Sequence, residues 1–242
     1  MEASIVIPKL EELLHSDRAY YIDYDTRIDR HQQRVMEISV YIAEMMGLSK
    51  ERIDDLKIAA RFHDYGKRFW HPAMLHKKKE VLDPYEAYLI KTHAAASVIL
   101  IDSKLDHVRL GRINKEVVSL LNESYQNIFD IIKYHHENYD GSGNPYGLNK
   151  DQVPLEAQIM RVADSYDAMR SPRLYRSIKN QMMAHQRAVS ELVIGMGTEF
   201  NPHIVRLFLE IPAGKLQRLY EHVSEITEEK QREKYGRVMI PN

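Results

Sequence analysis

Residues 52–67, RIDDLKIAARFHDYGK, carry the most informative pattern in this sequence. Apolar and small side chains recur three and four positions apart, which predicts a helix whose buried face holds Ile53, Leu56, Ala59, Ala60 and His63. Ser49 can cap the start of this helix. The spacing directs His63 toward the core, with Asp64 on or near the same face. Two polar side chains there are costly unless they pair or bind something.

Helical patterns of the same kind cover most of the remaining chain. We expect further helices over residues 31–46, 83–100, 113–121, 124–136, 155–169, 178–194, 202–210 and 216–235. Asp83 and Pro84 supply an N-cap and a proline at the first helical position. Residues 140–154 contain three glycines and two prolines and form a long loop. Strand patterns are weak throughout, so the predicted fold class is all-α.

Composition excludes several classes of protein. The 242 residues include no cysteine, which removes disulfide scaffolds, thiolate metal sites and cysteine nucleophiles. The formal net charge is −1, which argues against a broad basic surface for duplex nucleic acid. The chain has neither an apolar run long enough to span a membrane nor a secretory signal pattern. We therefore expect a cytoplasmic protein.

Histidines and aspartates on the apolar helical faces form a set of potential metal ligands. The set is His31, His63, Asp64, His93, His135, His136 and Asp164. Imidazole and carboxylate ligands suit iron, manganese, zinc, cobalt or nickel. One metal needs about four ligands, so a larger set suggests two metals that share a carboxylate. A buried hydrogen-bonded His-Asp couple is the structural alternative for His63 and Asp64.

The order of these residues resembles the HD-domain phosphohydrolases, and in particular their HD-GYP subclass. The resemblance rests on residues 62–67 (FHDYGK), 135–148 (HHENYDGSGNPYGL) and 161–169 (RVADSYDAM). It covers about residues 27–210 and implies a helical bundle with a metal site in its core. Members of the subclass typically hydrolyse cyclic di-GMP.

The resemblance also implies a role for each candidate residue. Asp64 is expected to be catalytic and to bridge two metals. One metal takes His31, His63 and Asp164, and the other takes His93, His135 and His136. Lys67 is expected to be catalytic and to bind a phosphate oxygen of the substrate. Arg173 and Arg176 are expected to bind substrate. The implied cofactors are two divalent transition-metal ions, iron or manganese before zinc, cobalt or nickel.

Two departures from the family pattern change what is expected. The Gly-Tyr-Pro triplet that names the subclass is Gly143-Asn144-Pro145 here, which weakens the prediction of docking to diguanylate cyclases. Arg27 stands where some members carry a glutamate ligand for a third metal, and arginine cannot ligate a metal. We therefore expect two metals and no third.

The chain is expected to have three parts. Residues 1–26 form an N-terminal helical extension, residues 27–210 the catalytic domain, and residues 211–242 a charged helical segment. That last segment either packs on the domain or forms a homodimer interface. The leading functional hypothesis is a metal-dependent phosphodiesterase for cyclic di-GMP or a related cyclic dinucleotide. The alternatives are an HD phosphohydrolase for another nucleotide and a non-catalytic cyclic dinucleotide receptor.

Overall fold

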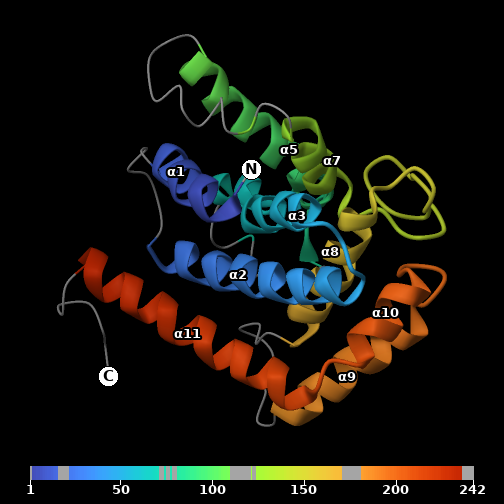
Figure 1. The fold of residues 1–242 in the computed structure, drawn as a ribbon. Helices are drawn as coiled ribbons and strands as arrows, with labels where there is room; N and C mark the ends of the chain where they lie inside the picture. The colour runs from blue at the N-terminus through green and yellow to red at the C-terminus, as the bar shows by residue number, and fades with distance from the viewer. Residues whose placement is uncertain are drawn as a thin grey trace.

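A computed structural model shows a bundle of helices (Figure 1). It describes residues 2–15, 22–70, 74, 77, 81–109, 121, 124–170 and 181–235. The α-helices are α1 (Ala3–His15), α2 (Ile22–Met45), α3 (Lys50–Phe62), α5 (Pro84–Arg109), α7 (Tyr125–Tyr134), α8 (Leu155–Arg170), α9 (Gln181–Ile194), α10 (Pro202–Leu209) and α11 (Ala213–Tyr235). A 3-10 helix, η1 (Tyr65–Phe69), follows α3. The described residues contain no β-strand, which confirms the all-α prediction.

The helix starts follow the capping residues of the sequence. The Ser49 hydroxyl accepts a hydrogen bond from the amide of Arg52, as expected for an N-cap. Asp83 and Glu86 each accept a hydrogen bond from the other's amide, a capping box that starts α5. α5 extends to Arg109 rather than ending near residue 100, because no glycine or proline interrupts residues 85–109. The helix expected over residues 113–121 lies almost wholly outside the described residues.

α2 lies at the centre of the bundle. It packs against α3 and α8 on one side and against α11 on the other (Figure 1). Val35, Ile38 and Ile42 of α2 are completely buried. They join a core that includes Leu56 of α3 and Met160 of α8. This arrangement brings the ends of α3 and α7 close to the middle of α2, α5 and α8.

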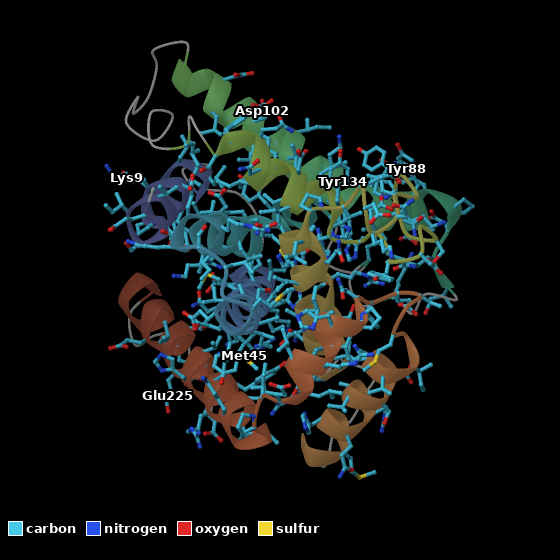
Figure 2. The ribbon with its side chains drawn as sticks, turned by 45° about the vertical axis from the view of Figure 1, so that its right-hand side comes forward. Lys9, Met45, Tyr88, Asp102, Tyr134 and Glu225 are labelled. Carbon is cyan, nitrogen blue, oxygen red and sulfur yellow. The ribbon has the colours of Figure 1, made fainter. Side chains whose placement is uncertain are left out.

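The first and last helices both cover this central bundle. α1 buries Val6 and Leu10 in the main core, and α11 buries Leu216 there. Further along α11, Val223 is buried while Glu225 is exposed and points away from the bundle (Figure 2). α11 therefore presents one buried apolar face to the bundle. None of the described helices is both long and apolar enough to cross a membrane.

Candidate metal centre

Two pairs of candidate ligands lie in the turns just after helix ends. α3 ends at Phe62, so that His63 and Asp64 lie in the turn before η1. α7 ends at Tyr134, and His135 and His136 follow it. Adjacent side chains on a regular helix diverge by about 100°, whereas a turn lets both reach one place. The helix expected over residues 124–136 ends two residues earlier than predicted, just before His135 and His136. The apolar spacing placed His63 on its helix, but α3 ends one residue before it, at Phe62.

Three of the histidine rings are held by the main chain of their own helix. The Nδ1 atoms of His63, His93 and His135 lie 2.6–2.8 Å from the carbonyl oxygens of Ala60, Ile90 and Ile132. A carbonyl can only accept, so Nδ1 carries the proton in each ring. Each Nε2 is then left with a lone pair, which is the form that binds a metal.

His31 is held differently, by a side chain from another helix. Its Nδ1 lies 2.7 Å from Oδ2 of Asp167, which belongs to α8. Its Nε2 lies 3.1 Å from Oδ1 of Asp164 and 3.5 Å from Oδ2 of Asp64. The ring of His31 therefore spans from the Asp167 carboxylate to the centre of the cluster.

Asp64 lies between the two halves of the cluster. Its Oδ2 faces His31 and His63, at 3.5 and 3.6 Å from their Nε2 atoms. Its Oδ1 faces His93, at 3.1 Å from Nε2. A carboxylate whose two oxygens point to different sets of ligands has the geometry needed to bridge two metals.

The candidate ligand atoms converge in overlapping groups of three, and within each group they lie within 4.8 Å of one another. One group, His63, Asp64 and His135, spans the centre of the cluster. The other two are His31, His63 and Asp164, and His93, His135 and His136. These are the two sets that the resemblance implied, and their assignment as ligands remains a prediction. Nε2 of His93 and Nε2 of His136 are 3.1 Å apart.

The donor atoms fit a pair of divalent ions. Nε2 of His63, Nε2 of His135 and Oδ1 of Asp64 are buried and have no hydrogen-bond partner in the described residues. Buried polar atoms are normally paired, because leaving one unpaired costs about 1–3 kcal/mol. Cations bound between the two groups would satisfy all three atoms.

The electrostatics of the cluster favour its metal-binding protonation state. Burial lowers the pKa of both His135 and His136 well below the usual value, so these rings are neutral at neutral pH. Burial alone would raise the pKa of Asp64. Its neighbours Lys67, His63 and His93 outweigh burial and hold that pKa well below the usual range. His31 is the exception, because hydrogen bonds to Asp164 and Asp167 overcome burial and raise its pKa to about 9.

The structure places one candidate substrate-binding cation, Lys67, at the cluster. Lys67 lies in η1, with its Nζ 2.6 Å from Oδ2 of Asp64, so it is at the cluster. Arg27 is exposed on α2, one helical turn before His31. Arg173 and Arg176 lie outside the described residues.

The glycine-containing loop after His136 is tied back to the cluster by Glu137. This buried carboxylate accepts hydrogen bonds from the amides of Tyr146 and Leu148. At Gly143, an added Cβ atom would lie 2.1 Å from the amide nitrogen of Asn138, which explains the glycine. The loop therefore packs directly against the turn that carries two candidate ligands.

The residues that hold His31 had no predicted role. Asp167 is buried and accepts hydrogen bonds from Arg34 and from Tyr220 as well as from His31. Arg34 and Asp167 were detectable in principle, since each lies three residues after a candidate ligand and so shares its helix face. Tyr220 lies on a distant helix and carried no such signal.

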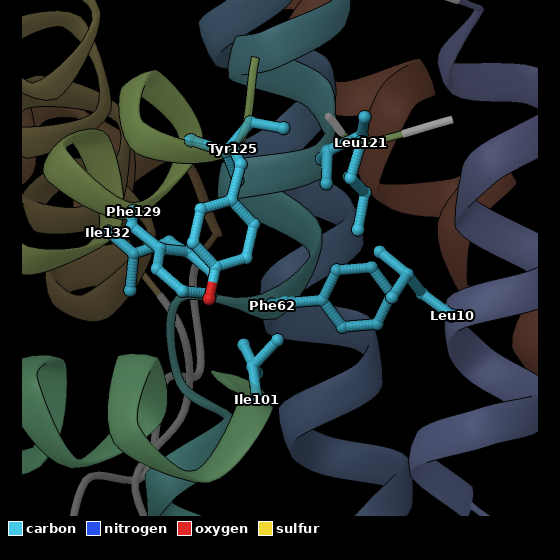
Figure 3. Close-up of a pocket in the computed structure, with 9 residues that line it drawn as sticks. Leu10, Phe62, Ile101, Leu121, Tyr125, Phe129 and Ile132 are labelled. Carbon is cyan, nitrogen blue, oxygen red and sulfur yellow. The ribbon is translucent and has the colours of Figure 1, made fainter. Parts of the chain in front are cut away.

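An apolar cavity elsewhere in the bundle has no part in this chemistry. It lies among α1, α3, α5 and α7 and is lined by Leu10, Phe62, Ile101, Tyr125 and other apolar residues (Figure 3). It contains none of the candidate ligands.

Five histidines and two aspartates converge in the core of this helical bundle, and such a set of side chains could bind metal. The sequence profile of the HD domain family matches residues 21–204, and the chain belongs to the HD domain family. This confirms the family that the sequence motifs implied.

Known proteins similar to this chain include cyclic dinucleotide phosphodiesterases. A cyclic di-GMP phosphodiesterase of Thermotoga maritima is 33% identical over 191 residues, which make up 79% of this chain and 46% of that protein. The 3'3'-cGAMP-specific phosphodiesterase 2 of Vibrio cholerae is 29% identical over 180 residues, or 74% of this chain and 30% of that protein. The chain thus spans less than half the length of these relatives.

Solved structures support the fold. An HDG"Y"P protein from Bdellovibrio bacteriovorus superposes with a TM-score of 0.55 at 17% identity, covering 86% of this chain and 59% of that chain. At this identity the likeness concerns the fold alone.

Proposed function

We propose that this chain is a metal-dependent phosphodiesterase that hydrolyses cyclic di-GMP or a related cyclic dinucleotide. The observation that carries the proposal is the position of Asp64, whose two oxygens face the two ligand groups. The names of the relatives support the substrate class, since they include both cyclic di-GMP and 3'3'-cGAMP phosphodiesterases.

The proposed cofactors are two divalent transition-metal ions. His31, His63 and Asp164 would hold one ion, and His93, His135 and His136 would hold the other, with Asp64 shared between them. Such a pair supplies Lewis-acid charge and lowers the pKa of water from 15.7 toward about 7, which provides a nucleophile at neutral pH. Because Arg27 cannot replace a carboxylate ligand, a third ion is not expected.

The protein's own cations serve the substrate in this proposal. The Lys67 ammonium lies 2.6 Å from Asp64, so a phosphate group placed at the cluster would come within its reach. There it would stabilise the negative charge that builds on the non-bridging oxygens in the transition state. Arg173 and Arg176 are proposed to bind the substrate's phosphates or guanine edges.

The test combines metal analysis with product analysis. Protein purified without oxygen should contain close to two equivalents of transition metal per chain. Incubated with cyclic di-GMP, and separately with 3'3'-cGAMP, it should yield linear dinucleotide or mononucleotide on chromatography, and metal-depleted protein should yield none. Metal-loaded protein that hydrolyses neither compound would overturn the proposal.

A further inference from the structure

The C-terminal helix α11 reaches the residue that holds a candidate metal ligand. We propose that Tyr220 of α11 is a positioning residue for the metal centre, acting on His31 through the carboxylate of Asp167. This inference rests on the metal centre of the proposed function. It gives α11 a role in orienting a metal ligand, in addition to its packing on the bundle.

The contacts of Asp167 leave its carboxylate no freedom to turn. Its Oδ1 accepts hydrogen bonds from the Tyr220 hydroxyl at 2.5 Å and from Nε of Arg34 at 2.6 Å. Its Oδ2 accepts from Nη2 of Arg34 at 3.0 Å and lies 2.7 Å from Nδ1 of His31. Asp167 is completely buried, so each of these bonds is shielded from water.

Tyr220 is itself fixed by two arginines. The guanidinium groups of Arg34 and Arg170 lie 4.9 and 3.9 Å from the centre of its ring, within the range of cation–π contacts. Arg170 in turn donates to the side chain of Gln217, also on α11, at 2.6 Å. Burial and the nearby Asp167 raise the pKa of Tyr220 well above its usual value, so the phenol keeps its proton and donates it to Asp167.

His31 needs such support more than three of the other histidines do. His63, His93 and His135 orient themselves on carbonyls of their own helices. His31 instead depends on a carboxylate of α8, and that carboxylate depends on α2 and α11 for its remaining bonds. Losing a hydrogen bond that orients a metal ligand typically lowers metal affinity or activity by about 10–100-fold.

The experiment removes only the hydroxyl group, with Tyr220→Phe. Wild-type and variant protein are depleted of metal and titrated with Mn²⁺ by equilibrium dialysis. The variant should bind its weakest Mn²⁺ with about tenfold lower affinity, the lower end of the range for such contacts. Tyr41→Phe is the matched control. Tyr41 of α2 also contacts α11, with the centre of its ring 3.3 Å from Nζ of Lys215. Its substitution should change Mn²⁺ affinity by no more than about twofold.

A double-mutant cycle separates positioning from general loss of structure. If Tyr220 acts through Asp167, then Tyr220→Phe should have no further effect on Mn²⁺ affinity in an Asp167→Asn background. The d–d absorption of bound Co²⁺ should also change in Tyr220→Phe and not in Tyr41→Phe.

Four results would contradict these proposals. Wild-type Mn²⁺ affinity in Tyr220→Phe, or an equal loss of affinity in both backgrounds, would overturn the inference about Tyr220. Wild-type protein that binds Mn²⁺ without hydrolysing cyclic dinucleotides would overturn the proposed function alone. Wild-type protein that binds no Mn²⁺ would overturn both.

Discussion

The histidines of the cluster are oriented by two different means, and this division differs from the one into ligand groups. On one side, His63, His93 and His135 donate from Nδ1 to carbonyls three residues earlier in the chain. On the other, His31 is oriented by Asp167, which is held by residues of α2 and α11. We call His63, His93 and His135 the main-chain side, because contacts within their own helices orient these rings. We call His31 the side-chain side, because its ring is oriented only when α2, α8 and α11 pack together. Single substitutions of residues that are not ligands can therefore disturb the second side far more easily than the first.

Asp64 faces both ligand groups, so its loss should have the largest effect. Asp64→Ala removes the carboxylate shared by the two ligand groups. We expect bound metal to fall and turnover to drop by at least about 10³-fold, since several kcal/mol of charge stabilisation are lost. Metal stoichiometry and turnover measured on the same preparation check this. A variant that keeps both metals would show instead that Asp64 and His63 are a structural pair.

Lys67 is the next most important group, because it is the cation beside that shared carboxylate. Lys67→Ala should lower kcat by about 10²–10³-fold, the cost of losing one electrostatic stabiliser, with metal content unchanged. Lys57→Ala is a suitable control, since Lys57 pairs with Asp54 at the same three-residue spacing outside the cluster. Steady-state kinetics of both variants with cyclic di-GMP provide the measurement. Activity close to that of wild type in Lys67→Ala would remove Lys67 from the mechanism.

The two sides should also respond to pH in opposite directions when metal is removed. The pKa of His31 is raised from 6.5 to about 9 in the folded protein. Its contribution to stability is therefore complete below pH 6.5 and is lost as the pH rises toward 9. This contribution is about 3 kcal/mol. The pKa values of His63 and His135 are lowered by burial, so the unfolded chain binds more protons and stability falls as the pH drops below 6.5.

Thermal unfolding of the metal-free protein across pH 5–9 measures both trends. The melting temperature should be highest near the unperturbed histidine pKa of 6.5. His31→Gln should flatten the alkaline decline and leave the acid decline in place, whereas His135→Gln should reduce the acid decline. If His31→Gln leaves the alkaline decline intact, then the hydrogen bonds to Asp164 and Asp167 do not hold a proton on His31.

The smallest effect on metal binding is expected for Ser97→Ala, which alters the packing near His63 and leaves its Nδ1 contact in place. The Ser97 hydroxyl accepts from the amide of Gly66 at 2.8 Å and lies 2.7 Å from the carbonyl oxygen of His63. Ser97→Ala leaves that buried amide without this partner and should cost about 1–3 kcal/mol of stability. Mn²⁺ affinity should be unchanged, because the Nδ1 contacts remain. An affinity loss as large as that of Tyr220→Phe would show that the main-chain side is no more robust than the other.

Much of the molecule follows from local sequence. The apolar spacing predicts the helices, and Ser49 and Asp83 predict where two of them begin. If His135 and His136 bind one metal, as the resemblance implies, a helix must end near them, because two neighbouring side chains cannot point the same way from a regular helix. The end of α5 was not predicted, since the helix continues for nine residues beyond residue 100.

The contacts that orient His31 could only come from the tertiary structure. Helix formation and capping depend on residues within about four positions of one another, so they can be read along the chain. His31, Asp167 and Tyr220 are far apart in sequence, and the distance from one to the next depends on how α2, α8 and α11 pack. Sequence alone determined which side chains can bind a metal. Packing decided which nitrogen and oxygen atoms face one another, because that depends on the relative positions of whole helices.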